Sequence, residues 1–380
     1  MLNSHKYDVI IIGAGVTGAS AAYELANSGI SVIVLEKEKL PRYKTCGGGV
    51  VRRAIEKLPF NINGIVERNF NMIDVYDHET DLHLEVSRGK PIITMMMRAD
   101  LDNLIISEAV KKGAKVNDGV KVLNLVNNDD VIEVVTGSFT LKADFVIAAD
   151  GATGISAKIS GMNKNFFSVP AIECEVYIPE DEFEYYKNST RFDFGFIPHG
   201  YAWVFPKRNH LSVGIASMKK LKVNLNDYLK RYFTTLGLKG ATNIAKHGNI
   251  IPINPFRVKP FFNRILLAGD TIGLADPITT EGISYAIESG QLAAKAIIEG
   301  SKNKIKVEKI YAKSLKPLFN ELKYARILAW FVHGSPNIRR FVFKHYGKAL
   351  SDLLADVIMG EKKYSGWMKN PLSYLKLLKP

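Results

Sequence analysis

A strand, a glycine turn and a helix open the chain, and this combination constrains the fold more than any other feature. By composition Val9–Ile12 is a buried parallel strand, and a helix is predicted over Val16–Asn27. Three glycines fit the pattern G-x-G-x-x-G around this junction: Gly13, Gly15 and Gly18. The first allows the tight turn, the second lets a pyrophosphate approach the backbone, and the third lets the helix pack closely on the strand.

A second strand with a terminal acid completes the unit. Val32–Leu35 is apolar and ends at Glu36, whose carboxylate can accept hydrogen bonds from ribose hydroxyls. The helix directs its free N–H groups and the positive end of its dipole at the phosphates. The spacing therefore predicts a bound dinucleotide. The alternative is a structural βαβ unit with a glycine-rich turn.

A later segment, Phe145–Gly154, favours FAD over a nicotinamide. Its apolar strand runs into Asp150 and Gly151, where the glycine allows a sharp turn beside a cofactor.

The segment Arg264–Gly290 points the same way. A strand ends in Gly269 and Asp270, and the Asp270 carboxylate can bond ribityl or ribose hydroxyls. A helix predicted over Gly282–Glu299 would aim its N-terminus at the flavin ring and stabilise negative charge on the reduced flavin.

With these motifs the chain resembles the flavoprotein superfamily of aromatic hydroxylases and geranylgeranyl reductases, over roughly residues 5–300. The resemblance implies an α/β fold with a Rossmann-like FAD-binding domain of the hydroxylase and glutathione-reductase type. It also implies that Arg98, in RADLDNLI, lies near the FAD. The alternative for Arg98 is a solvated side chain at the start of the helix predicted over Arg98–Lys112.

The chain between the nucleotide-binding segments predicts an inserted, mostly antiparallel sheet, because its apolar residues alternate with a period of two. The strands Asn71–Asp77 and Leu82–Val86 are expected to join this sheet, with the helix Leu225–Leu236 behind it. The expected boundaries are residues 1–75, 95–165 and 255–300 for the FAD-binding domain, 76–94 and 166–254 for the substrate (catalytic) domain, and 301–380 for a basic helical C-terminal region.

The most specific motif on the substrate side is PHGYAWVFP, residues Pro198–Pro206. Alternation places Tyr201, Trp203 and Phe205 on one face of a strand. The motif resembles the P-x-x-Y-x-W-x-F-P signature of the geranylgeranyl reductase family, which implies that these aromatics line a prenyl pocket near the flavin. The alternative is an aromatic sheet core without a ligand.

A second motif is YKTCGGGV, in which Cys46 precedes three glycines. Cys46, Gly47 and Gly49 match the cysteine and G-x-G of many reductases of this family. The resemblance implies that the loop lies beside the flavin and that Cys46 takes part in catalysis, by helping to deliver a proton; the alternative is packing. Arg42 and Lys44 could meet a diphosphate or a phospholipid headgroup, or remain solvated.

The net charge of +13 is concentrated at one end of the chain. Residues 301–380 hold 17 Lys and Arg against 5 Asp and Glu, while the first 300 residues are nearly balanced. Helices are predicted over Ile305–Phe331 and Asn337–Leu350, and this basic region suits an anionic membrane surface because its aromatics are expected to be exposed. Arg339 is among the basic residues expected to reach that surface. The aromatics are Trp330, Phe331, Phe341, Phe343, Tyr346, Tyr364 and Trp367. A solvated helical cap is the alternative, and no nucleic-acid-binding fold is recognised.

Further limits come from composition. The two cysteines cannot form a disulfide framework, which favours a reducing compartment. We find no signal-peptide pattern and no long apolar stretch, so a cytoplasmic protein with peripheral membrane association is expected. The histidines are scattered without zinc-type spacing, and no metal site is predicted.

The function that these motifs predict is FAD-dependent reduction of carbon–carbon double bonds in a geranylgeranyl-type isoprenoid: a lipid, a diphosphate, a pigment precursor or a prenylquinone. The electron donor would be NAD(P)H or a ferredoxin-like carrier, because the sequence has no second dinucleotide motif. The rivals are a flavin-dependent aromatic monooxygenase or halogenase, and a prenyl-binding carrier on a degenerate FAD fold.

Overall fold

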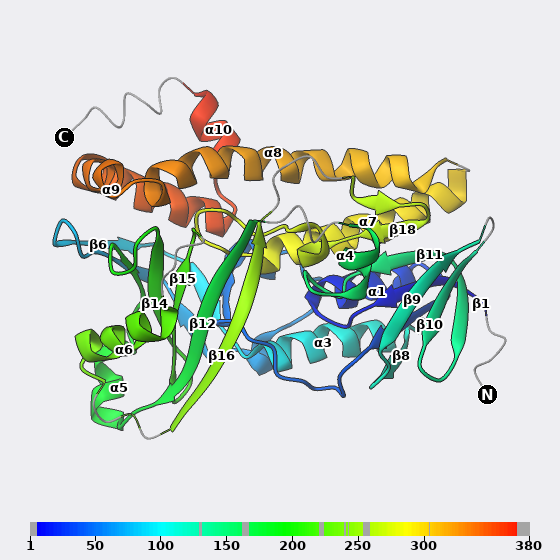
Figure 1. Ribbon diagram of the computed structural model, residues 1–380, viewed down its shortest axis with the longest axis horizontal. Coiled ribbons are helices and arrows are strands. Elements are labelled where there is room, and N and C mark those ends of the chain that lie inside the picture. Colours follow the sequence, from blue (N-terminus) through cyan, green and yellow to red (C-terminus); the bar gives the residue numbers. More distant parts are fainter. Residues whose placement is uncertain are drawn as a thin grey trace.

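A long helical layer lies along one side of two sheets that sit end to end (Figure 1). The structure is a computed structural model that describes residues 6–128, 131–161, 167–219, 224–238, 241, 243–253, 259–303 and 305–370. The first sheet and the N-terminus lie at one end of the molecule, and the second sheet lies at the other.

The first sheet carries the glycine turn and, in the described ranges, has eight strands. Its central strands run parallel in the order β18-β11-β1-β2-β8, and β9 and β10 extend antiparallel from β11. All of β2 is buried, as expected for a parallel strand covered on both faces. The strands are β1 (Lys6–Ile12), β2 (Val32–Glu36), β8 (Lys115–Asp118), β9 (Val122–Asn127), β10 (Ile132–Thr136), β11 (Thr140–Ala148), β17 (Phe261–Phe262) and β18 (Ile265–Leu267).

Three helices cover this sheet. The helix α1 (Val16–Asn27) packs against both α3 (Arg98–Lys111) and α7 (Ile283–Asn303). The predicted bounds of α1 are confirmed, and those of α3 differ by one residue at the C-terminal end. The short α4 (Ile155–Ile159) and the 3-10 helix η3 (Gly269–Ile272) follow the ends of β11 and β18.

The second sheet has seven strands within the described ranges, in the order β16-β12-β15-β14-β13-β5-β6. The pairing is antiparallel except between β13 and β5, and the prediction that the two early strands join this sheet is confirmed. The helices α5 (Glu180–Tyr186) and α6 (Leu225–Leu236) pack on one face through their own apolar cluster. The strands are β5 (Met72–Asp77), β6 (Leu82–Ser87), β12 (Phe167–Tyr177), β13 (Thr190–Phe194), β14 (Gly200–Pro206), β15 (Leu211–Ser217) and β16 (Asn243–Ile253).

A small third sheet, in the order β3-β7-β4, follows the cysteine loop. Its strands and neighbouring helices are β3 (Gly49–Val51), β4 (Arg68–Phe70), β7 (Ile93–Met95), α2 (Arg52–Ile55) and η1 (Asn63–Ile65). The predicted domain boundaries at 165–166 and 254–255 lie outside the described residues, and the division into domains stays a prediction.

The C-terminal region is helical, as predicted, but its first helix is shifted by two residues and its second is longer. The helix α8 (Val307–His333) runs along both sheets, and α9 (Pro336–Met359) lies over the second sheet near β6, followed by α10 (Tyr364–Lys369) (Figure 1). The prediction that the second helix ends at Leu350 is wrong, because the apolar spacing continues to Met359 and the helix closes on Gly360 in the left-handed region.

Candidate active site

The glycine turn at the end of β1 is fixed by packing. Gly13 has a φ of +96°, and a Cβ there would lie 2.5 Å from the carbonyl oxygen of Ala149. A Cβ at Gly18 would overlap the carbonyl of Gly13. These two glycines let α1 and the end of β11 approach the turn, so the local backbone requires them whether or not a ligand is bound.

Gly15 differs from its neighbours. A Cβ at this position would meet Arg42 at 3.5 Å and Asp102 at 3.8 Å, which are ordinary contacts. Gly15 is also the N-cap of α1 and provides no side-chain cap for the first N–H groups. The protein itself therefore does not demand a glycine here, and the open approach to a helix N-terminus suits a phosphate. This cradle fits the pyrophosphate of FAD.

Glu36 lies beside the same turn. Its Oε2 accepts a hydrogen bond from the Ala14 N–H at 2.8 Å, and its Oε1 accepts one from the Glu38 N–H at 3.1 Å. The Nε of Arg42 lies 3.4 Å from Oε2. A carboxylate offers about four lone-pair sites, so acceptor capacity remains for ribose hydroxyls.

Arg98 is largely buried, unlike a solvated arginine. It forms two bonds to the Asp102 carboxylate, of 2.9 and 3.1 Å. Burial alone would lower the pKa of Arg98, but Asp102 and the nearby Cys46 raise it above its ordinary value. Arg42 reaches the same Asp102 at 3.4 Å. The sequence reasoning missed Asp102, which brings both arginines to the glycine turn.

Two further turns lie at the carboxyl ends of parallel strands, where ligands bind in such sheets. Asp150 follows β11, and its Oδ2 accepts a bond from the Ser156 N–H at 3.0 Å. Its Oδ1 is buried without a hydrogen-bond partner among the described residues, and burial raises the pKa of the carboxyl. Gly151 adopts a φ of +83° and donates to Thr271.

The turn after β18 packs against α1. Gly269 has a φ of +61°, and a Cβ there would collide with Thr17. Across the turn, a Cβ at Gly282 would come 3.8 Å from the Asp270 carboxylate. Lys44 lies close enough for the Asp270 charge to act on it, although burial is the larger effect and lowers the Lys44 pKa.

The cysteine loop packs directly against β14. A Cβ at Gly47 would lie 3.0 Å from Trp203 and from Phe205, and one at Gly49 would lie 3.1 Å from Phe205. The two aromatics thus need glycines opposite them. The loop and the aromatic strand, far apart in the sequence, form one contact.

Tyr201 also lines an apolar cavity between the second sheet and the C-terminal helices. Its hydroxyl donates to the carbonyl of Thr279 at 2.7 Å. The cavity is lined by Ile73, Val75, Val86, Phe192, Phe194, Tyr201, Ile278, Thr279, Val332, Phe343, Leu350, Ser351, Leu354, Ala355 and Ile358. Trp203 and Phe205 are not among these residues, but their rings continue the row from Tyr201. The ring centroids of Tyr201 and Trp203 lie 5.9 Å apart, and those of Trp203 and Phe205 lie 6.2 Å apart.

The sequence reasoning missed the contribution of α9 to this cavity. Phe343, Leu350, Leu354 and Ile358 recur at helical spacing, and this signal was available in the sequence. The helix approaches β6 closely, because a Cβ at Gly347 would come 3.0 Å from Leu84.

Two expectations about the C-terminal aromatics and charges are wrong. Phe343 and Tyr364 are buried rather than exposed, and Arg339 is fully buried. Arg339 pairs with Glu79 at 2.5 Å, which anchors α9 to the β5–β6 turn. The N-terminal half of α9 is thus held to the protein through a buried cation.

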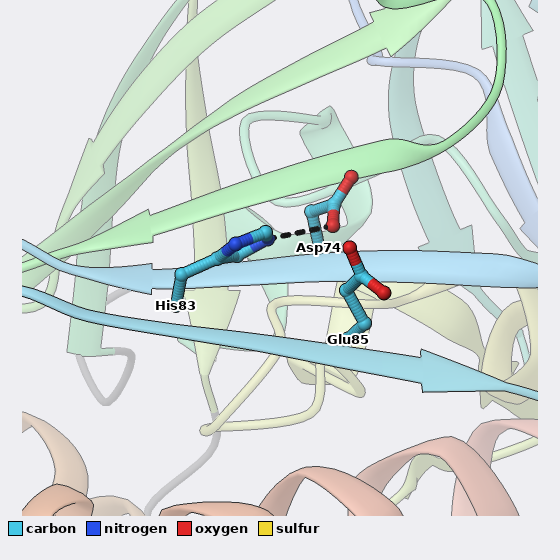
Figure 2. A group of neighbouring side chains, drawn as sticks. All are labelled: Asp74, His83 and Glu85. Atoms are coloured by element: carbon cyan, nitrogen blue, oxygen red, sulfur yellow. Dashed lines mark hydrogen bonds and ion pairs between the residues drawn. The ribbon is translucent and has the colours of Figure 1, made fainter.

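Asp74, His83 and Glu85 form a further group on β5 and β6 (Figure 2). Their ligand atoms lie within 4.8 Å of one another, and the His83 ring reaches Asp74 at 2.9 Å. The group is on the sheet face opposite the cavity, since the neighbouring Ile73 and Val75 line the cavity. His83 also stacks on Tyr76, so pairing across the strands accounts for the group.

No helix in the described part of the chain combines the length and apolar character needed to cross a membrane.

The comparisons agree with this geometry. Residues 6–304 match the FAD binding domain family. The chain is 30% identical to the geranylgeranyl diphosphate reductase of Synechocystis sp., over 78% of this chain and 76% of that protein. It is 26% identical to the digeranylgeranylglycerophospholipid reductase of Methanococcus vannielii, over 85% of this chain and 87% of that protein.

Solved structures show the same fold. A geranylgeranyl bacteriochlorophyll reductase-like protein of Thermoplasma acidophilum superposes with a TM-score of 0.79 at 21% identity, covering 98% of this chain and 96% of that one. A flavin-dependent brominase superposes with a TM-score of 0.73 at 17% identity, covering 94% of each, which is a likeness of fold alone. The chain is thus an FAD-dependent oxidoreductase, and it belongs to the geranylgeranyl reductase family.

Proposed function

We propose that this oxidoreductase saturates isolated carbon–carbon double bonds of a geranylgeranyl-type isoprenoid, and that the apolar cavity beside Tyr201 holds the chain. The observation that carries the proposal is the cavity itself, which is continuous with the aromatic strand that packs on the cysteine loop. The names of the two reductase relatives supply the substrate class, as a diphosphate or a glycerophospholipid.

The cavity suits a hydrocarbon chain physically. Its walls are almost entirely aliphatic and aromatic, a lining typical of sites for small apolar molecules. Burial of apolar surface contributes about 25 cal/mol per Å², so an isoprenoid can be held without specific polar contacts. The isoprenoid would be oriented by polar groups at the end of it that faces the flavin.

The proposed cofactor contacts are those at the three glycine turns. They are Gly13, Gly15, Gly18, Glu36, Arg98, Asp150, Gly151, Gly269, Asp270 and Gly282. Bound FAD, once reduced, supplies a hydride. The chain's own residues position the alkene, exclude water and provide the proton.

Cys46, Gly47 and Gly49 are proposed to form the floor of the reaction site, with Trp203 and Phe205 above them. Two groups interact with the Cys46 sulfur. The Gly48 N–H donates a hydrogen bond to it at 3.4 Å, and the Arg98 guanidinium lies close enough to interact with it electrostatically. The sulfur thus accepts from its neighbours. Cys46 is proposed to shape the site and to lie near the alkene.

A membrane surface is the proposed source of the substrate. Ile327, Trp330, Phe331 and Phe341 are all exposed, and they flank the turn between α8 and α9. The exposed Arg340 lies in the same region, beside the elements that cover the cavity. Exposed aromatics next to cations suit an anionic interface, through which a chain could pass sideways into the cavity.

Incubation of the reduced enzyme with geranylgeranyl diphosphate, or with a geranylgeranylated glycerophospholipid, tests the function by mass spectrometry. Each double bond that is reduced adds two hydrogen atoms to the product. NAD(P)H and a reduced ferredoxin are compared as the electron donor. Unchanged prenyl products together with substrate-dependent oxygen uptake on an aromatic substrate would instead support a monooxygenase or halogenase.

A further inference from the structure

Two carboxyl side chains, Glu173 and Glu175, are buried on the same face of the second sheet as Trp203 and Phe205. The pairing of β12, β15 and β14 aligns Glu173 with Gly214 and Trp203, so the three positions share one face. Gly214 leaves room for the indole, because a Cβ there would overlap the Trp203 ring. Glu173 thus lies on the same side as the residues that pack on the cysteine loop.

Glu173 is connected to that loop by a hydrogen bond. Its Oε2 accepts from the hydroxyl of Tyr43 at 2.9 Å, and its Oε1 accepts from Ser212 at 3.1 Å. Tyr43 lies three positions before Cys46, whose charge acts on it, and its ring stacks on His247 of β16 at 4.3 Å. Glu173 is 2% exposed whereas Tyr43 is 42% exposed, so the hydroxyl joins the buried carboxyl to the accessible side of the loop.

A second carboxylate, Glu175, favours the protonated form of Glu173. Glu175, two residues along β12, lies 2.9 Å from His210, and Lys207 acts on it electrostatically. Burial would raise the pKa of Glu175, but the His210 ring and the Lys207 charge hold it below its ordinary value. Burial and the adjacent Glu175 charge raise the pKa of Glu173 to about 8. One of the two acids thus stays ionised while the other keeps its proton.

We propose that Tyr43 is the catalytic acid of alkene reduction, and that Glu173 positions its hydroxyl and recharges it with a proton. The inference rests on the proposed function. When one alkene carbon receives a hydride, the π bond breaks and the other carbon would take the Tyr43 proton. The hydrogen bond between Tyr43 and Glu173 then reverses: the carboxyl of Glu173 gives its proton to the Tyr43 oxygen, which leaves a carboxylate that solvent reprotonates.

The surroundings support this direction of transfer. Burial raises the pKa of Tyr43 above its ordinary value, so the phenol does not ionise and passes a proton only as it receives one. The titratable and charged groups that face Glu173 are Tyr43 from the loop, Glu175 from β12, and His247 from β16, with Lys246 next to it on that strand.

The first test is single turnover of the pre-reduced holoenzyme with geranylgeranyl diphosphate as a function of pH. The wild-type rate should fall as pH rises through about 8, because Glu173 loses its proton. Glu173→Gln and Tyr43→Phe should each slow the alkene step about 100-fold, the low end for a general acid, and remove this pH dependence. FAD content, KM and the rate of flavin reduction by dithionite should stay at wild-type values.

Glu175→Gln is the matched variant. It removes the neighbouring negative charge, so the fall in rate should move to lower pH while the activity below it persists. A merely structural role for the pair would not shift the profile. Wild-type rates and an unchanged profile in Glu173→Gln or in Tyr43→Phe would overturn the proposal.

The second test needs no turnover. Infrared spectra of the flavin-free protein should show a protonated carboxyl band that disappears as pH rises past about 8 and is absent from Glu173→Gln. A wild-type enzyme that leaves geranylgeranyl diphosphate unreduced but shows this band would contradict the proposed function and retain the assignment of the buried proton. Absence of the band from the wild-type protein would overturn the inference.

Discussion

Substitution of Ala355 by Phe tests whether the apolar cavity holds the isoprenoid chain. Ala355 lies on α9, is 1% exposed and faces the cavity. A benzyl group there would project into the cavity. The variant should therefore fold, bind FAD and unfold at nearly the wild-type temperature.

The expected loss is in substrate affinity. A phenyl ring takes the room of one isoprene unit, about five carbon atoms at about 0.8 kcal/mol for each buried methylene, or about 4 kcal/mol in all. At 1.4 kcal/mol per decade this weakens binding by roughly 10³-fold. Flavin fluorescence or absorbance during titration with geranylgeranyl diphosphate measures the Kd, and a shorter prenyl diphosphate should lose less.

Ala349→Phe is the matched control, because Ala349 lies on the same helix, is partly exposed and does not line the cavity. It should bind the long chain with wild-type affinity. If Ala355→Phe binds the chain as tightly as Ala349→Phe does, the cavity is not the chain-binding site and the reasoning from its apolar lining fails.

Three further predictions concern the cofactor, the surface and the pH dependence of stability. Gly15→Ala should keep the fold, since its Cβ meets only ordinary contacts in the protein, but should lose FAD to a clash with the pyrophosphate; full flavin occupancy by absorbance would show that the glycine has no such role. Arg340→Glu with Lys344→Glu should weaken sedimentation with anionic liposomes while FAD content stays unchanged. The control is Lys37→Glu with Lys111→Glu, which are also exposed but lie on the nucleotide-binding side, and it should sediment like the wild-type protein. Equal losses in the two variants would reject the C-terminal surface as the membrane contact. Arg339 is unsuitable for this test because its charge is buried. Burial lowers the pKa of His333 to about 4, so the unfolded chain takes up the proton first on acidification. The unfolding free energy should therefore fall by up to roughly 3 kcal/mol between about pH 6.5 and 4. His333→Gln should flatten this pH dependence in denaturant titrations. An identical slope in that variant would exclude His333 as its source.

Local patterns fixed much of the nucleotide-binding half. The spacing of Gly13, Gly15 and Gly18 between two apolar strands has one common structural solution, and α1 begins and ends where the sequence predicts. The alternation of apolar residues in the inserted segment likewise predicted a sheet, and the prediction that β5 and β6 belong to it is confirmed. These features depend on neighbours in the sequence, so periodicity and turn chemistry suffice to predict them.

The substrate side could not be predicted in the same way. The sequence placed Tyr201, Trp203 and Phe205 on one face, but only the folded chain shows that Gly47 and Gly49 meet two of them while the third lines a cavity. The basic C-terminal region suggested a solvated or membrane-bound surface, since charge and aromatic content do not say which side of a helix is buried.

By itself the sequence determined the glycine turn between two strands and a helix, the alternating strands of the inserted sheet, and the aromatic strand, because each is encoded within a few consecutive residues. Tertiary structure alone decided that α9 closes the cavity, that Arg339 is buried against the β5–β6 turn, and that Glu173 bonds to Tyr43. The partners in that last pair stand 130 positions apart, and a contact of that range depends on how whole sheets and helices pack. Burial then sets the chemistry, since a carboxyl that would be ionised in water keeps its proton where desolvation and a second charge oppose ionisation.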